Sequence, residues 1–215
     1  MHLTRLVRGL AAGTAVTAIA LAAAPAPASA NSGSKPSGTR SLAAVLTADT
    51  SGFDRNSRDY DILTKAVLTV LQAKPQSPVK VLTDGTVALT AFLPDDRAFE
   101  RLAQDVGGGH SLPSEQQAFT AVAGLGVDTV EQVLLYHVIP GATIDARAAR
   151  KADGAALTTA LGPAITVDVR YGWCIRLVDA DRNDRDPVVV RTDINRGNKQ
   201  IAHGIDRVLR PVDLP

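Results

Sequence analysis

The stretch Leu134-Leu135-Tyr136-His137-Val138-Ile139-Pro140-Gly141 places a tyrosine and a histidine inside a dense apolar run, which a Pro-Gly break then ends. A run this apolar belongs in a core, where a tyrosine or histidine ring needs a hydrogen-bond partner. We therefore expect Tyr136 and His137 to lie at the centre of the domain. A base or ligand role for His137 is disfavoured, because no Ser, Cys or acid lies at a spacing typical of a catalytic triad. A neutral, buried imidazole bonded to a backbone or tyrosine partner is favoured, and His203, in an apolar strand, is interpreted in the same way.

The first 30 residues have the pattern of a secretory signal peptide. Arg5 and Arg8 make the start positive, residues 9–24 are small and apolar, and Ala28-Ser29-Ala30 is a small-x-small cleavage site. The apolar run is shorter and less apolar than a membrane span requires, so we expect cleavage rather than a retained transmembrane anchor. Residues 31–40 are rich in Ser, Gly and Pro and predict a disordered linker. The folded domain is expected over residues 41–212, secreted to the extracellular space or associated with the cell wall.

The composition is that of a globular protein, with 45% hydrophobic and 21% charged residues. The predicted signal peptide, which is called the leader below, contains two of the 23 Lys and Arg residues and none of the 22 acids. The remaining chain therefore has a formal charge of −1. This near-neutral charge argues against nucleic acid or an anionic membrane as the main partner. Cys174 is the single cysteine and is expected to be a small buried residue, so stability must come from packing and not from an internal disulfide. We expect a monomer.

The hydrophobic periodicity predicts helices first and in the middle of the chain and strands mostly at its end, which is an α+β domain. Asp84-Gly85 lies between two apolar runs and predicts a hairpin of residues 79–83 and 86–93. Asp95 and Ser114 are expected helix N-caps, and Asp128 is expected to open the helix that leads into Tyr136. Other helices are expected at 41–46, 60–73 and 146–151, and strands at 157–159, 165–169, 171–178, 188–192, 199–203 and 205–209.

Three segments resemble the signatures of the fasciclin (FAS1) domain family. Residues 89–99, with Pro94, Asp95 and Phe99, look like a strand that ends in Pro, an acid and then Ala-Phe. Residues 133–141 are similar to the central Tyr-His motif, and residues 201–211, with His203 and Asp206, look like the closing signature. The resemblance covers nearly all of residues 41–212 and implies a small β-sandwich or wedge with helices packed along it. It also implies a single-domain bacterial member.

The resemblance further implies an extracellular adhesion or interaction module. In animal members the Tyr-His region and an Asp-Ile pair before the closing signature are implicated in receptor binding. The matching positions here are Tyr136, His137, Asp193 and Ile194.

Metal and cofactor sites are not expected from the motifs. The three histidines after the leader have no metal-ligand spacing, and no hydrolase, zinc-protease or phosphate-loop motif is present. Asp179, Asp181 and Asn183 resemble the start of a calcium loop, but Asp184 stands where Gly is required and Val190 where Glu is required. A solvated hairpin loop is therefore favoured there. Aromatic residues are 4% of the chain, which is sparse for a stacking platform.

These observations favour a secreted, non-enzymatic FAS1 domain that acts in adhesion or protein interaction at the cell surface or in the extracellular matrix. Its partner would be an unidentified extracellular protein or cell-surface component. A carrier of a small apolar ligand, held in a cleft between helices and sheet, is the alternative. A secreted hydrolase built on His137 ranks below both.

Overall fold

Strand β1 (Leu89–Pro94) lies at the middle of the fold and is buried along its whole length. The computed structural model describes residues 37–212, so the predicted signal peptide and residues 31–36 of the predicted linker lie outside the described part of the chain. β1 pairs with β7 (Gln200–Ile205) in parallel and with β2 (Val138–Pro140) antiparallel. β6 (Val189–Ile194) completes a four-stranded sheet in the order β2-β1-β7-β6.

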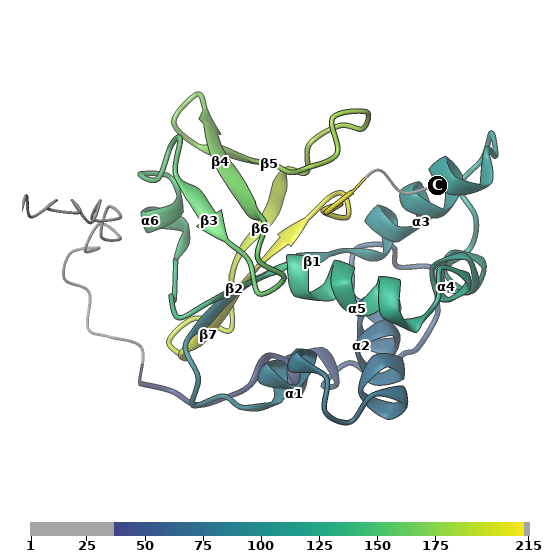
Figure 1. Ribbon diagram of the computed structural model, residues 1–215, viewed down its shortest axis with the longest axis horizontal. Coiled ribbons are helices and arrows are strands. Elements are labelled where there is room, and N and C mark those ends of the chain that lie inside the picture. Colours follow the sequence, from purple (N-terminus) through teal and green to yellow (C-terminus); the bar gives the residue numbers. More distant parts are fainter. Residues whose placement is uncertain (1–36, 213–215) are drawn as a thin grey trace, which may run out of the picture. The chain divides into compact units, whose positions relative to one another are not determined.

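A second sheet of three strands has the order β3-β4-β5 (Figure 1). The strands are β3 (Ala156–Thr158), β4 (Ala164–Arg170) and β5 (Cys174–Val178). The helices are α1 (Leu42–Leu46), α2 (Asp61–Ala73), α3 (Asp96–Gly107), α4 (Glu115–Gly124), α5 (Val127–Tyr136) and α6 (Ala146–Ala149), with a 3-10 helix, η1, at Pro78–Thr83. The predicted α+β class is confirmed.

Alternation along β1 divides the interior into two hydrophobic clusters, because successive side chains of a strand point to opposite faces. Leu89, Ala91 and Leu93 pack against the helices. Phe92 points the other way, into a cluster between the two sheets that also contains Ile165, Val167, Ile175 and Leu177 of β4 and β5. The central sheet is therefore covered by helices on one face and by the second sheet on the other, as Figure 1 shows.

The helix caps follow the sequence signals in most places. Asp95 accepts a hydrogen bond from the Ala98 amide at the start of α3, and Ser114 and Gln117 form the expected capping box at α4. The helix that leads into Tyr136 begins differently. Gly126, and not Asp128, is its N-cap, and no side chain caps it. No single helix among residues 37–212 is long and apolar enough to cross a membrane, and α4 and α5 reach that length only as a pair bent by 105°.

The predicted hairpin around Asp84-Gly85 is wrong. Ser77 caps residues 78–83 into a 3-10 helix with Pro78 in its first turn, and no strand pairs there with β1. Residue 85 must be a glycine because of tertiary packing and not because of a hairpin turn, since a Cβ on it would lie 1.8 Å from the Thr39 backbone oxygen. Residues 37–40, the N-terminal segment, pass over this glycine.

The linker prediction is also wrong for residues 38–40 of that segment. The Gly38 amide donates to Gly197 O at 3.0 Å, and the Lys199 amide donates to Gly38 O at 2.9 Å. The Arg40 amide donates to Asn198 Oδ1 at 2.9 Å. These bonds fasten the segment to the β6–β7 turn, so the folded part begins before residue 41.

Two strand expectations at the end of the chain need correction. β5 and β6 do not form a strand pair but belong to different sheets, joined by an isolated bridge between Arg176 and Val188. Residues 206–209 do not continue as a strand after β7. Cys174, at the start of β5, is half-buried and not fully buried as expected.

Candidate functional site

His137 lies at the end of α5 with both ring nitrogens bonded to backbone groups. Its Nδ1 lies 2.7 Å from Val133 O, and its Nε2 accepts the Leu209 amide at 2.9 Å. The two bonds together require a neutral ring protonated on Nδ1, because an amide can donate only to an unprotonated nitrogen. Burial, with 4% of the residue exposed, lowers the pKa of His137 to about 4. The imidazole therefore links helix α5 to the closing segment of the chain.

Tyr136 is fully buried, with 0% of the residue exposed, in the cluster between the two sheets. Its hydroxyl donates to Ala164 O at 3.4 Å, and burial raises its pKa to about 12. A direct receptor contact by Tyr136 or His137, which the family resemblance implies, does not fit this burial. The expected core position of both rings is confirmed.

His203 is the third polar ring of the interior. Its Nε2 lies 2.8 Å from Ile144 O, and its Nδ1 lies 3.3 Å from the Asp193 amide nitrogen. Burial lowers its pKa. The pattern matches that of His137, in which a neutral ring joins two stretches of backbone.

Asp193 and Ile194 lie at the end of β6 and are half-buried. Asp193 has a φ of 59°, and its Oδ1 accepts the Ala146 amide at 2.8 Å, so it holds the start of α6. Ile194 packs against the cluster under the helices. The structure does not bring this pair together with Tyr136 and His137 on one surface patch, because both rings are inside.

The other signature residues are structural. Pro94 ends β1 and is paired with Ile205, and Phe99 packs in the helix-side cluster. Burial raises the pKa of Asp95 to about 6. Asp206 accepts the Val188 amide on Oδ1 at 2.8 Å, while its carbonyl accepts from Arg101 at 2.7 Å.

The loop after β5 is not the solvated loop expected from the sequence. Asp181 is buried, and Asp179 accepts the Arg210 amide at 2.8 Å. The Arg210 guanidinium is itself buried and pairs with Asp105, Asp181 and Asp184 at 2.7, 3.4 and 3.1 Å. The acids of this loop are therefore used to hold a buried arginine.

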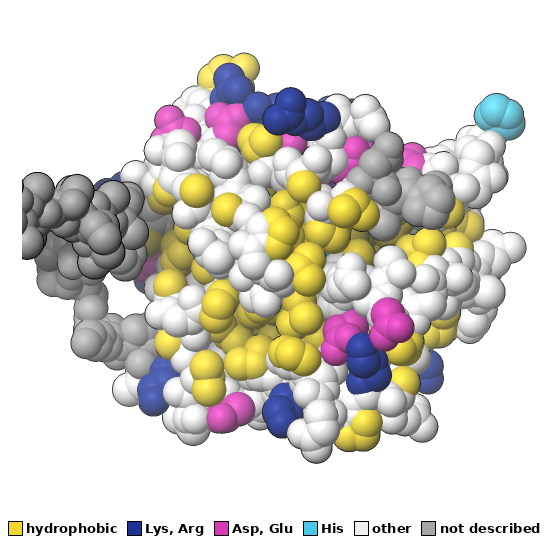
Figure 2. All heavy atoms as spheres, viewed as in Figure 1, with side chains coloured by type: hydrophobic (Ala, Val, Ile, Leu, Met, Phe, Trp, Pro, Cys, Tyr) yellow, Lys and Arg dark blue, Asp and Glu magenta, His cyan; other side chains and the backbone are white. Residues whose placement is uncertain are grey.

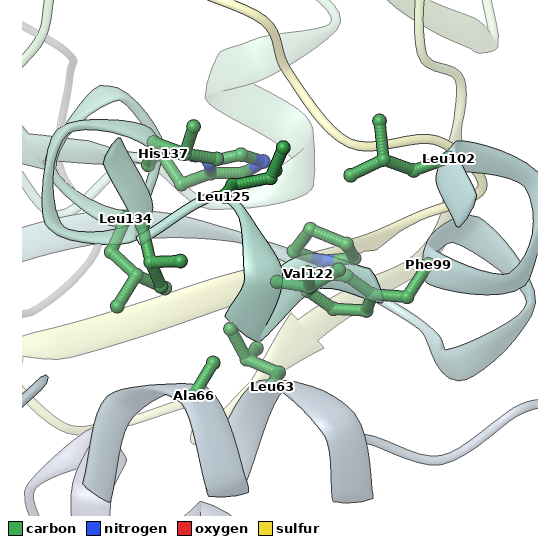
Figure 3. A pocket seen from close by; sticks show the side chains of 11 residues that line it. Leu63, Ala66, Phe99, Leu102, Val122, Leu125, Leu134 and His137 are labelled. Carbon is green, nitrogen blue, oxygen red and sulfur yellow. Dashed lines mark hydrogen bonds between the residues drawn. The ribbon is translucent and has the colours of Figure 1, made fainter. Parts of the chain in front are cut away.

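Two apolar cavities lie among the described residues. One, under His137 between α2, α3, α4 and α5, has a volume of about 20 Å³ (Figure 3). The other lies between the sheets beside Phe92 and His203 and is also about 20 Å³. A single water needs at least about 10–15 Å³, and ligand pockets measure about 300–1,000 Å³. Neither cavity has room for a small apolar ligand in this conformation.

The tip of the β4–β5 hairpin carries the most exposed aromatic side chains of the described residues. Tyr171 is 90% exposed and Trp173 is 68% exposed. Tyr171 and Gly172 have φ values of 55° and 76°, which makes the turn tight. Arg170, next to them, pairs with Asp168. Figure 2 shows hydrophobic and basic side chains together at the top of the view, where Figure 1 places this end of β4.

Comparison with known proteins then identifies the fold. Residues 63–211 match the family model of the fasciclin domain. The chain belongs to the fasciclin domain family. It is similar in structure to a FAS1 domain pair from the insect cell adhesion molecule Fasciclin I, with a TM-score of 0.55 and 16% sequence identity. The match covers 79% of this chain and 50% of that one, so the chain spans half the length of that solved structure. No curated protein sequence matches the chain.

The aromatic tip was missed from the sequence because residues 171–178 were interpreted as one strand. The signal for it was Arg170-Tyr171-Gly172-Trp173 between two alternating apolar runs, since a glycine between aromatics favours a turn.

Proposed function

We propose that this FAS1 domain is secreted and acts without catalysis, as an adhesion or interaction module that binds an extracellular protein through the tip of its β4–β5 hairpin. The observation that carries this proposal is the exposure of Tyr171 and Trp173 on a tight turn. Tyr, Trp and Arg dominate the binding energy of protein interfaces. The leader pattern in the first 30 residues supports secretion.

The hairpin suits this role because it holds its aromatics in place before a partner arrives. β4 and β5 pair over five positions, from Thr166–Val178 to Arg170–Cys174. Below the tip, Asp168 of β4 accepts from Arg170 of its own strand and from Arg176 of β5, and the second of these bonds joins the two strands. A rigid anchor loses less conformational entropy on binding, which favours affinity.

The hydrolase alternative depends on His137 as the catalytic base, and the environment of His137 does not favour that role. Both nitrogens of His137 are bonded to backbone, and the ring is buried, so it offers neither a free base nor access to substrate. The carrier alternative has room for about one water in each cavity. Interaction through the surface is the function that the geometry favours.

The test is adhesion of cells and of extracellular protein fractions to the purified, immobilised chain. A Tyr171→Ser, Trp173→Ser double variant should lose at least tenfold in binding while keeping the Tm of the parent, because both side chains are exposed. Leu68→Ser is the matched control, since Leu68 is an exposed apolar residue on α2. Equal loss in the control, or full binding by the double variant, would contradict the role of the hairpin tip.

A further inference from the structure

Three helices begin with an acidic residue at the same place in the fold. Asp61 is the first residue of α2, Asp96 of α3 and Glu115 of α4. Figure 1 shows these three helices packed together. Asp54 and Asp59, from the loop before α2, complete a cluster of five carboxylates. Ligand oxygens of Asp54, Asp59 and Asp61 lie within 4.8 Å of one another, and so do those of Asp59, Asp96 and Glu115.

Part of this cluster has an ordinary structural explanation. Asp96 accepts the amides of Asp61 and Ile62 at 3.1 and 2.9 Å, so it caps α2 from the neighbouring helix. Glu115 accepts the Asp54 amide on Oε2 at 2.6 Å. Carboxylates at helix N-termini are favoured by the helix dipole. These contacts use one oxygen of Glu115 and both oxygens of Asp96.

Asn56 donates to two further oxygens, from its amide to Asp54 Oδ1 at 2.5 Å and from Nδ2 to Asp59 Oδ2 at 2.7 Å. Three other oxygens have no such explanation. Asp59 Oδ1, Asp61 Oδ2 and Glu115 Oε1 are buried atoms without a hydrogen-bond partner. Asp61 is only 8% exposed and Glu115 only 2%. Among the described residues, none of the five carboxylates takes part in an ion pair with Lys, Arg or His. Buried carboxylates normally have either a partner or a bound cation.

We propose that Asp54, Asp59, Asp61, Asp96 and Glu115 bind a calcium ion. Oxygens that share one calcium, at about 2.3–2.6 Å each, lie at most about 5 Å apart, and both overlapping triads meet this limit through Asp59. The donors are all carboxylate oxygens, which suits a hard cation, and no Cys or His is present to favour zinc. Five acids from one loop and three helices form an irregular site, and calcium accepts irregular geometry more readily than magnesium.

The five carboxylates lie close enough to repel one another when they are ionised. A bound divalent cation would remove this repulsion and join residues 53–60 to all three helices. Its main effect on the molecule would be stabilisation of this end of the helical layer.

The test is titration of the EDTA-treated, full-length chain with calcium chloride, by calorimetry and by thermal unfolding. Binding should be one to one, and 10 mM calcium should raise Tm by about 5 °C or more if the Kd is near the ~10⁻⁴ M of extracellular modules. Sodium chloride at equal ionic strength is the salt control.

Substitutions at the unpartnered oxygens sharpen the test. Asp61→Asn and Glu115→Gln should each weaken calcium binding at least tenfold, yet should not lower Tm without calcium, because they remove an uncompensated carboxylate. Asp145→Asn, at the cap of α6, should bind like the parent. The proposal is overturned if the parent chain shows no heat and no Tm change with calcium, or if both cluster variants keep the parent affinity. An equal response to magnesium would overturn the assignment to calcium. If one variant does not fold, the other and the titration of the parent decide.

Discussion

Replacing His137 by Ala tests whether the Tyr-His motif is architectural. The change leaves the Leu209 amide and the Val133 carbonyl without their buried partner. Each orphaned group costs about 1–2 kcal/mol, and the void left by the ring adds about 1–2 kcal/mol. The expected loss is therefore about 3–6 kcal/mol, out of the roughly 5–15 kcal/mol by which a typical domain is stable.

Urea unfolding at pH 7.5 should be followed by circular dichroism. The fluorescence of Trp173 is unsuitable, because this single tryptophan lies exposed on the hairpin tip and does not report on the core. His110→Ala is the control, since His110 is exposed, and it should change the free energy of unfolding by less than about 0.5 kcal/mol. A loss below about 1 kcal/mol for His137→Ala would refute the linking role and return His137 to the list of functional candidates.

The remaining predictions concern pH, a buried charge and a close backbone approach. The pKa of His137 is about 4 in the folded chain against about 6.5 unfolded, so the unfolded state takes up the proton first and stability falls as pH falls from about 6.5 to 4. A His137→Gln variant has no titrating group at this position. Over this pH range the free energy of unfolding of the parent should therefore fall by about 3 kcal/mol relative to that of the variant. The buried carboxyl groups have the opposite effect on stability, but they are present in both proteins and cancel in the difference. Arg210→Met should cost about 3 kcal/mol in chemical unfolding because it leaves the buried Asp181 unpaired, and adding Asp181→Asn should recover part of the loss. Gly85→Ala should cost about 1–3 kcal/mol and lower Tm, since its Cβ would meet the backbone of the N-terminal segment, whereas a Cβ at Gly107 meets nothing within 4 Å and Gly107→Ala should be neutral.

The parts of the fold that sequence reasoning predicted are those decided by local chemistry. The caps at Asp95 and Ser114 and the apolar periodicity of α2 depend on residues within one or two turns of each other. The burial of His137 was predicted from the density of apolar residues around it. The exposed turn at Tyr171 and Gly172 was missed because apolar residues on both sides of it concealed a short local signal.

The parts that sequence reasoning could not predict depend on contacts between distant residues. Gly85 resembles a hairpin turn locally, but it is required by the passage of residue 39 over it. The carboxylate cluster combines acids that begin three separate helices, and no spacing rule brings Asp61, Asp96 and Glu115 together. The loop after β5 appeared solvated because the arginine that it surrounds, Arg210, lies near the end of the chain.

The parallel pairing of β1 with β7 has a consequence for when the protein can fold. Leu89 pairs with Gln200 and Pro94 with Ile205, so the central sheet consists of β1 and the short strand β2 alone until β7 has been synthesised. The His137 link to Leu209 also waits for these last residues. Contacts of such long sequence separation form slowly. A chain built in this way completes its central sheet only after β7 has been synthesised.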